Sequence, residues 1–217
     1  MAFVVAVAQQ KGGSGKSTIA ANLAAVLAAE GRRVALLDTD PQGSITRWHE
    51  ERQRHAGGKA APLLFDSPSG WRVPTALDRL RRNHDVVILD TPPHAGTDAK
   101  VAIRAADLVL MPLQPSPVDL WASTDTRRLA AEERRPLRAL LNRVPAQGKM
   151  RDKVVEALAL LEVPLLEERL GNRAQFGAAF LEGLSVTEAA PRSTAAAEMR
   201  AVAAAVAALA NGSGGGR

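Results

Sequence analysis

A chain of 217 residues that is 46% hydrophobic can bury the core of one α/β domain. It has no cysteine, which excludes disulfides, cysteine-ligated zinc and iron–sulfur clusters and suits a reducing cytoplasm. Its net charge of +5 and its pI of about 10.2 favour polyanionic partners such as nucleotides or DNA. No stretch is apolar for long enough to span a bilayer, and the first apolar run is too short for a signal peptide, so we expect a cytoplasmic protein.

Strand-like and helix-like patterns alternate along the chain, and several strand candidates are continuous apolar runs, typical of strands covered on both faces. The predicted strands are Phe3–Ala8, Arg33–Asp38, Pro62–Phe65, Asp85–Asp90, Leu108–Leu113, Leu137–Leu141 and Val163–Leu165. The predicted helices are Lys16–Glu30, Ser44–His55, Val73–Arg82, Thr97–Ala105, Val118–Arg134, Lys149–Leu161, Arg173–Glu182 and Thr194–Ala210. This alternation predicts an α/β fold with a doubly wound, mostly parallel sheet and helices on both faces.

No internal repeat and no linker interrupts this pattern, so we expect a single domain over residues 1–210. Residues 211–217 are rich in glycine, and we expect them to form a flexible tail.

The clearest chemical signal is the stretch from Gln10 to Thr18, which lies between a predicted strand and a predicted helix. Glycines allow successive backbone N–H groups to turn towards an anion, and the start of a helix adds its positive end. In such a loop Lys16 reaches the outer phosphates and the Ser17 hydroxyl binds Mg²⁺. The residues predicted to bind the nucleotide are Gly12, Gly13, Ser14, Gly15, Lys16, Ser17 and Thr18.

The loop departs from the usual phosphate-loop pattern in two places. Gln10 stands where a first glycine is expected, and Lys11 adds a second lysine. A glycine-rich turn without a ligand is the alternative interpretation. The strand, the helix and the Gly-Lys-Ser sequence in register favour a phosphate loop.

Carboxylates follow two of the predicted strands. Asp38 and Asp40 lie on the same side of a strand end, where such a pair can hold a Mg²⁺-bound water and orient a water that attacks a phosphate. An ordinary Asp-Pro turn is the alternative. Asp90 ends the apolar run Val86–Leu89, the position of the residue that holds Mg²⁺ in nucleotide-binding folds. Because parallel strands end at one edge of a sheet, these residues should converge on the phosphate loop.

Asn142 follows the predicted strand Leu137–Leu141. Its amide could recognise the edge of an adenine through a paired donor and acceptor, which makes it a candidate nucleotide-binding residue. A polar cap at the strand end is the alternative.

The sequence from Lys11 to Thr18 resembles the deviant Walker A motif of the ParA/MinD family of P-loop ATPases. The signature lysine of the family matches Lys11 and its phosphate-loop lysine matches Lys16. Its switch I carboxylates match Asp38 and Asp40, and its Walker B aspartate matches Asp90. The segments from Asp38 to Trp48 and from Pro112 to Ser123 resemble the small ParF-type partition ATPases, so the likeness covers nearly the whole chain.

The resemblance implies a slow, Mg²⁺-dependent ATPase whose catalytic residues are Lys11, Lys16, Asp38 and Asp40 and whose metal ligands are Ser17, Asp38 and Asp90. Two subunits would close around two ATP molecules, with Lys11 of each reaching the phosphates of the other. The closed homodimer would bind nonspecific DNA and associate with the nucleoid. A cargo-bound activator of the ParB/ParG kind would stimulate hydrolysis, so that plasmids, chromosome regions or protein complexes are positioned or segregated.

The family contacts DNA through basic residues late in the chain. Arg169, Arg173, Arg192 and Arg200 occupy the corresponding region and are candidate DNA contacts. Solvated or ion-paired arginines are the alternative, because no helix carries a continuous basic stripe.

Two other functions are compatible with the same motifs. A MinD-like regulator on a membrane surface needs a basic amphipathic helix at its end. Here the alanine-rich last helix leads into residues 211–217, which lack bulky apolar anchors, so we expect no membrane partner. A nucleotide-switched scaffold would keep the loop but turn over little ATP. The presence of Asp38, Asp40 and Asp90 argues against complete loss of turnover.

Overall fold

Seven parallel strands form one sheet in the part of the chain that the computed structural model describes, which is residues 1–55, 58, 60–93 and 96–212. The strands are β1 (Phe3–Val7), β2 (Val34–Asp38), β3 (Leu64–Asp66), β4 (Val86–Asp90), β5 (Leu108–Leu113), β6 (Leu137–Val144) and β7 (Leu165–Gly171). Their order in the sheet is β3-β2-β4-β1-β5-β6-β7, with β1 in the middle. The predicted doubly wound α/β fold is therefore confirmed.

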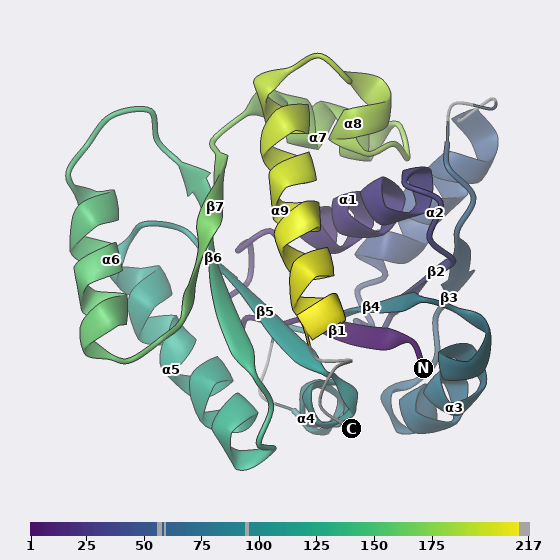
Figure 1. The fold of residues 1–217 in the computed structure, drawn as a ribbon, viewed down its shortest axis with the longest axis horizontal. Helices are drawn as coiled ribbons and strands as arrows, with labels where there is room; N and C mark the ends of the chain where they lie inside the picture. The colour runs from purple at the N-terminus through teal and green to yellow at the C-terminus, as the bar shows by residue number, and fades with distance from the viewer. Residues whose placement is uncertain (56–57, 59, 94–95, 213–217) are drawn as a thin grey trace.

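Helices connect the strands and cover both faces of the sheet (Figure 1). The helices α1 (Lys16–Ala29), α2 (Ser44–His55), α7 (Ala174–Leu181), α8 (Val186–Ala189) and α9 (Thr194–Gly212) pack on one face. The opposite face carries α3 (Val73–Asn83), preceded by the short 3₁₀ helix η1 (Gly70–Arg72), and α4 (Thr97–Ala105), α5 (Pro117–Glu132) and α6 (Met150–Leu160). Within the described residues, none of these helices has both the length and the apolarity needed to cross a membrane.

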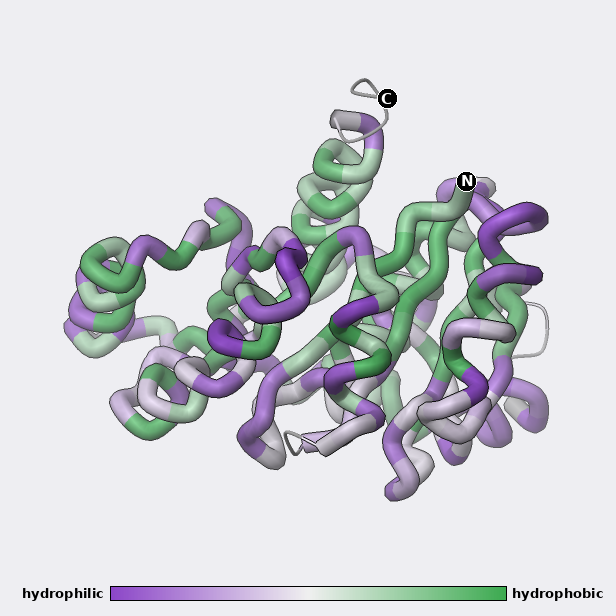
Figure 2. The backbone as a smooth tube through the Cα atoms, turned by 90° about the horizontal axis from the view of Figure 1, so that it is seen from below, coloured by the Kyte–Doolittle hydropathy of each residue, from purple (hydrophilic) through white to green (hydrophobic). Residues whose placement is uncertain are grey.

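The central strands are apolar because both of their faces are covered. Val5 and Val7 of β1 point into the layer with α1, while Val4 and Ala6 point into the layer with α3 and α4. The apolar stretches run through the middle of the molecule, and the most hydrophilic stretches lie on its outside (Figure 2).

The register of the sheet places three strand ends side by side. Asp90 of β4 is paired with Val7 of β1 on one side and with Asp38 of β2 on the other. The loop after β1 and the two aspartates therefore meet at one edge of the sheet, as the sequence predicts.

The last strand differs from its prediction. Val163–Leu165 is predicted as a strand, but β7 begins at Leu165 and continues to Gly171. Its sequence includes Glu167, Glu168 and Arg169, so it does not form the continuous apolar run by which the other strands are predicted. An edge strand tolerates such charged side chains, whereas a central strand does not. The short helix α8 was also not predicted. At the other end, α9 includes Asn211 and Gly212, and the rest of the predicted tail, 213–217, lies outside the described residues.

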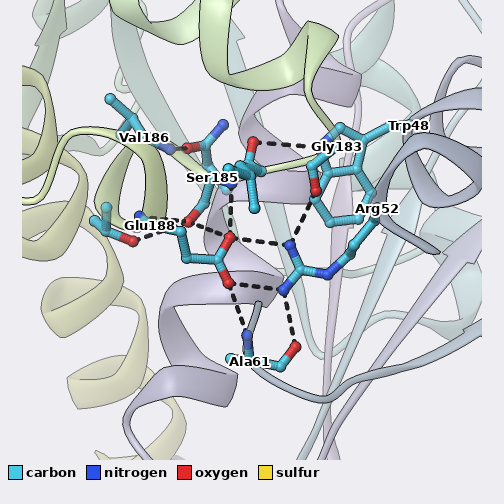
Figure 3. A network of polar contacts seen from close by, with 10 residues as sticks. Trp48, Arg52, Ala61, Gly183, Ser185, Val186 and Glu188 are labelled. Carbon is cyan, nitrogen blue, oxygen red and sulfur yellow. Dashed lines mark hydrogen bonds and ion pairs between the residues drawn. The ribbon is translucent and has the colours of Figure 1, made fainter. Parts of the chain in front are cut away.

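A buried ion pair joins Arg52 of α2 to Glu188 of the short helix α8 (Figure 3). Arg52 donates from Nη2 to Glu188 Oε1 at 2.7 Å and from Nη1 to Oε2 at 2.9 Å, and it also donates to the carbonyl oxygens of Gly183 and Ala61. Burial acts to raise the pKa of Glu188, but Arg52 and the backbone N–H groups of Ser185 and Ala61 hold it below its usual value. The pair therefore fixes the helix that follows Asp38 and Asp40 to the α7–α8 region.

Candidate nucleotide-binding site

The loop between β1 and α1 has a backbone that only glycine adopts readily. Gly15 is the N-cap of α1 and has a φ of 95°, in the left-handed region. A Cβ atom there would lie 2.4 Å from Asn142 Nδ2, so any larger residue would displace the Asn142 amide. This geometry leaves the N-terminal end of α1 open to an anion.

Lys16 is the first residue of α1, and its side chain is buried. Burial lowers the pKa of Lys16 below its ordinary value, while the carboxylates of Asp90 and Asp40 act in the opposite direction. A buried ammonium group is attracted strongly to phosphate, because little water competes for it.

Asp90 is completely buried at the end of β4. Neither of its carboxylate oxygens makes a well-formed hydrogen bond with the described residues. Burial raises the pKa of Asp90 to about 7, and the neighbouring Ser17 hydroxyl and Lys16 ammonium offset only part of this effect. Buried carboxylate oxygens without partners are rare and call for an explanation. Mg²⁺ prefers oxygen ligands, so Asp90 together with Ser17 fits a Mg²⁺ ion.

Asp38 and Asp40 have different surroundings. Asp38 is buried, and its carboxylate accepts hydrogen bonds from the N–H and hydroxyl of Thr46 in α2, at 2.9 and 2.8 Å, and from the N–H of Asp40 at 3.2 Å. Asp40 is only half-buried, accepts from the N–H of Gln42 and lines the cavity over the phosphate loop. Of the two, Asp40 is therefore the carboxylate that faces the space for a ligand. The roles of both as catalytic residues, and of Asp38 as a metal ligand, stay predictions.

Two adjoining cavities lie along the phosphate loop. The first, of about 260 Å³, contains most of the predicted loop residues. Gly12, Gly13, Gly15, Lys16, Ser17 and Thr18 line it, together with Asp40, Pro93 and Arg143. Ser14 lies beneath it, fully buried and with no hydrogen-bond partner for its hydroxyl among the described residues. The second cavity, of about 480 Å³, continues past Asn142 and Arg143 to Asn172, Arg173 and Phe176.

Asn142 packs directly against the phosphate loop. Its Nδ2 donates to the carbonyl oxygen of Ser14 at 2.8 Å, and its Oδ1 accepts from the backbone N–H of Arg143 at 2.9 Å. Both ends of the amide are thus engaged within the chain. Recognition of adenine by Asn142 stays a prediction, and it would use the second N–H of Nδ2 and the second lone pair of Oδ1.

Lys11 does not line either cavity. Its ammonium group is bonded to the buried carboxylate of Asp119 in the first turn of α5. Asp119 also accepts from the Ser116 hydroxyl and from the N–H of Gln114. Burial acts to raise the pKa of Asp119, but Lys11 and these other donors hold it below its usual value.

The four predicted DNA-contacting arginines lie on or near β7 and α9, two elements that pack together. Arg169, Arg192 and Arg200 are exposed, and Arg200 donates to the carbonyl oxygen of Pro191. Arg173 is half-buried, pairs with Glu198 at 2.6 Å and lines the second cavity. DNA binding by these residues stays a prediction.

Three residues of this region were missed in the sequence: Asp119, Arg143 and Phe176. Asp119 follows a proline-rich strand end, and Arg143 follows Asn142 directly, so their positions carried a weak signal. Nothing in the sequence around Phe176 indicated a role in the site, because one aromatic residue in a helix usually belongs to the core.

The chain is similar in sequence and in structure to known nucleotide-binding proteins. A model of the CobQ/CobB/MinD/ParA nucleotide binding domain matches residues 5–186. The chain is 34% identical over 203 residues to the "Maintenance of carboxysome distribution protein A" of Halothiobacillus neapolitanus, covering 91% of this chain and 92% of that protein. It is 38% identical over 192 residues to the protein of the same name from Gloeobacter kilaueensis, covering 85% and 84%. The septum site-determining protein MinD of Pyrococcus horikoshii, solved with Mg-ADP, matches with a TM-score of 0.80 at 18% identity, over 97% of this chain and 98% of that one.

Proposed function

The chain belongs to the CobQ/CobB/MinD/ParA nucleotide-binding family, and we propose that it is a ParA-like ATPase that positions cargo in the cell. ATP and Mg²⁺ are its ligands in this proposal. Two relatives, covered over 92% and 84% of their length, are named for carboxysome distribution, which favours a protein complex as the cargo over a plasmid.

The observation that carries the proposal is the carboxylate of Asp90. It is buried, its oxygens have no well-formed hydrogen bond within the described residues, and it lies beside Ser17 and Lys16. A bound Mg²⁺ would be held by Asp90 and Ser17 and would neutralise charge on the phosphates. Lys16 contributes a second positive charge in the same cavity. Asp40, at the cavity wall, orients the attacking water.

Lys11 gives the reason to propose a homodimer. It lies in the phosphate loop, yet its ammonium group is bonded to Asp119 outside the cavity. A lysine at this position can supply charge to the phosphates of a second copy, in the manner of an arginine finger. Hydrolysis then depends on assembly of the dimer.

In the same proposal the ATP-bound dimer binds DNA without sequence preference and so associates with the nucleoid. Arg169, Arg173, Arg192 and Arg200 are its DNA contacts. An activator carried by the cargo stimulates slow hydrolysis and releases the dimer from DNA. Because the named relatives concern carboxysomes, we propose that this activator belongs to the cargo complex and differs from ParB.

A DNA-binding assay in ATP, in ADP and without nucleotide tests the proposal, with sedimentation of the same samples to measure the dimer. We expect the dimer and DNA binding only with ATP and Mg²⁺. DNA affinity should fall with salt by a slope of roughly −0.9 per neutralised phosphate. The Lys16→Ala variant is the control and should bind neither ATP nor DNA. Equal DNA binding in ATP and ADP would contradict the proposed nucleotide switch.

A further inference from the structure

Arg143 has an unusual backbone for its position in the sheet. Three described residues other than glycine have a positive φ: Arg134 at 53°, Glu162 at 52° and Arg143 at 51°. Arg134 and Glu162 follow the last turns of α5 and α6, where left-handed residues commonly end a helix. Arg143 is instead inside β6, where no helix end explains its conformation.

An irregularity in the sheet accompanies this conformation. The pairing of β6 with β7 shifts register between Leu141 and Val144, on either side of Arg143. Such bulges redirect side chains and are common beside functional sites. A left-handed backbone at an arginine costs free energy, and strain of this kind is concentrated at ligand sites.

The bulge turns two consecutive side chains towards the same loop. In a regular strand, neighbouring residues point to opposite faces of the sheet. Here Asn142 Nδ2 donates to the carbonyl oxygen of Ser14 at 2.8 Å, and Arg143 Nη1 donates to that of Gly13 at 3.3 Å. The bond from Arg143 is long and exposed, so it can be exchanged at little cost.

Arg143 also lies where the two cavities meet. It lines the cavity over the phosphate loop and the larger cavity that extends to Phe176, and Gly15 and Thr18 are the other residues that line both. A nucleotide that places its phosphates in the first cavity and its base in the second has its sugar–phosphate junction here. Arginine forms strong, charge-assisted hydrogen bonds with phosphate oxygens.

We propose that Arg143 is a nucleotide-binding residue that exchanges its bond to the Gly13 carbonyl for the phosphate next to the sugar. This inference rests on the proposed binding of ATP. Because ATP and ADP share that phosphate, Arg143 should contribute equally to the affinity for both. A residue that senses the outermost phosphate would instead favour ATP alone.

Equilibrium binding of ATP and ADP, each with Mg²⁺, to the Arg143→Ala variant tests this assignment. We expect the affinity for both nucleotides to fall by roughly 10-fold to 100-fold. Arg143→Lys keeps the charge but not the fork of donors and should recover only part of the affinity. Arg134→Ala is the matched control, because it removes an exposed arginine with the same backbone conformation far from the cavities and should leave both affinities unchanged.

The melting temperature of each variant without nucleotide separates binding from loop support. If Arg143 only supports the loop through Gly13, Arg143→Ala should lower the melting temperature of the nucleotide-free protein and leave the stabilisation by nucleotide unchanged, which would overturn the assignment. A loss of affinity for ATP alone would overturn it as well. If the wild-type protein binds neither nucleotide, the proposed function itself fails; if it binds both and Arg143→Ala binds equally well, only this inference fails.

Discussion

The ammonium group of Lys11 is bonded to the buried carboxylate of Asp119, so the extra lysine of the phosphate loop is held by α5 of its own chain. Under the proposed function, Lys11 must leave this partner before it can reach the phosphates of a second subunit. The contact therefore stabilises the form in which Lys11 is withdrawn.

Asp119→Asn should make the ATP-dependent dimer form at several-fold lower protein concentration. The substitution keeps the shape of the side chain but removes the charge that holds Lys11. Sedimentation velocity over a concentration series with ATP and Mg²⁺ measures the effect. Asp125→Asn, on the exposed side of the same helix, is the control and should leave the dimer unchanged. A weaker dimer in Asp119→Asn would show that the contact does not oppose assembly.

Asp90→Asn should change how stability depends on pH in the absence of nucleotide and Mg²⁺. The pKa of Asp90 is raised from 3.8 to about 7 in the folded protein, so the folded state binds this proton more tightly than the unfolded state. The contribution of protonated Asp90 to the free energy of unfolding is fully present below about pH 4. It is lost as the pH rises through about 7, and it amounts to at most about 4 kcal/mol. Urea unfolding from pH 4 to pH 8 should show this loss in the wild type and not in Asp90→Asn. If the free energies of unfolding of the wild type and Asp90→Asn changed with pH in parallel, this prediction would be contradicted.

Arg52→Met should lower the free energy of unfolding by about 3–5 kcal/mol, because it leaves Glu188 buried without its ionic partner. Adding Glu188→Leu should recover part of this loss, since an apolar pair avoids the buried charge. Urea unfolding of the single and double variants measures both effects. Arg54→Ala breaks a more exposed pair on the same helix and should cost less than about 1 kcal/mol.

Gly183→Ala should destabilise the fold by about 2 kcal/mol or more. The φ of Gly183 is 69°, and an added Cβ would lie 2.1 Å from the backbone nitrogen of Arg52. Gly177→Ala is the matched control, because an added Cβ there meets nothing within 4 Å and alanine favours the helix α7 by about 0.5–1 kcal/mol. Thermal unfolding of the two variants should therefore shift in opposite directions.

Arg169→Ala and Arg192→Ala should each weaken binding to any DNA sequence and reduce the salt slope by about 1. Both arginines are exposed, so their guanidinium groups are free to approach phosphates. DNA titrations at several salt concentrations, with ATP and Mg²⁺, measure the slope. An unchanged slope in both variants would place the DNA contacts elsewhere.

Most of the fold could be predicted because the central strands are buried on both faces. Val86–Leu89 is apolar throughout, and the following Asp90 stands out at its end. The edge strand β7 could not be predicted in the same way, because exposure on one side permits Glu167 and Arg169 within it. Strands are thus easiest to predict from the sequence where both of their faces are buried and only apolar residues are tolerated.

The arrangement of the candidate site was predictable where it follows from strand ends and not where it depends on packing. Asp38 and Asp90 converge with the phosphate loop because parallel strands end together. The contact of Lys11 with Asp119 joins residues 108 positions apart and depends on how α5 begins. The direction of Arg143 depends on a bulge, which the pattern of apolar residues around it does not reveal.

The position of β1 has a consequence for synthesis of the chain. Of the seven strands described, β1 is made first, but its two neighbours in the sheet are β4 and β5, which end at Asp90 and Leu113. While the chain is being made, the apolar β1 therefore has no partner strand until β4 has left the ribosome. Asn142 and Arg143, which border the cavities, emerge later still. ATP would thus find its complete site only after all seven strands but the edge strand β7 have been made, so nucleotide would not guide the early folding of the sheet.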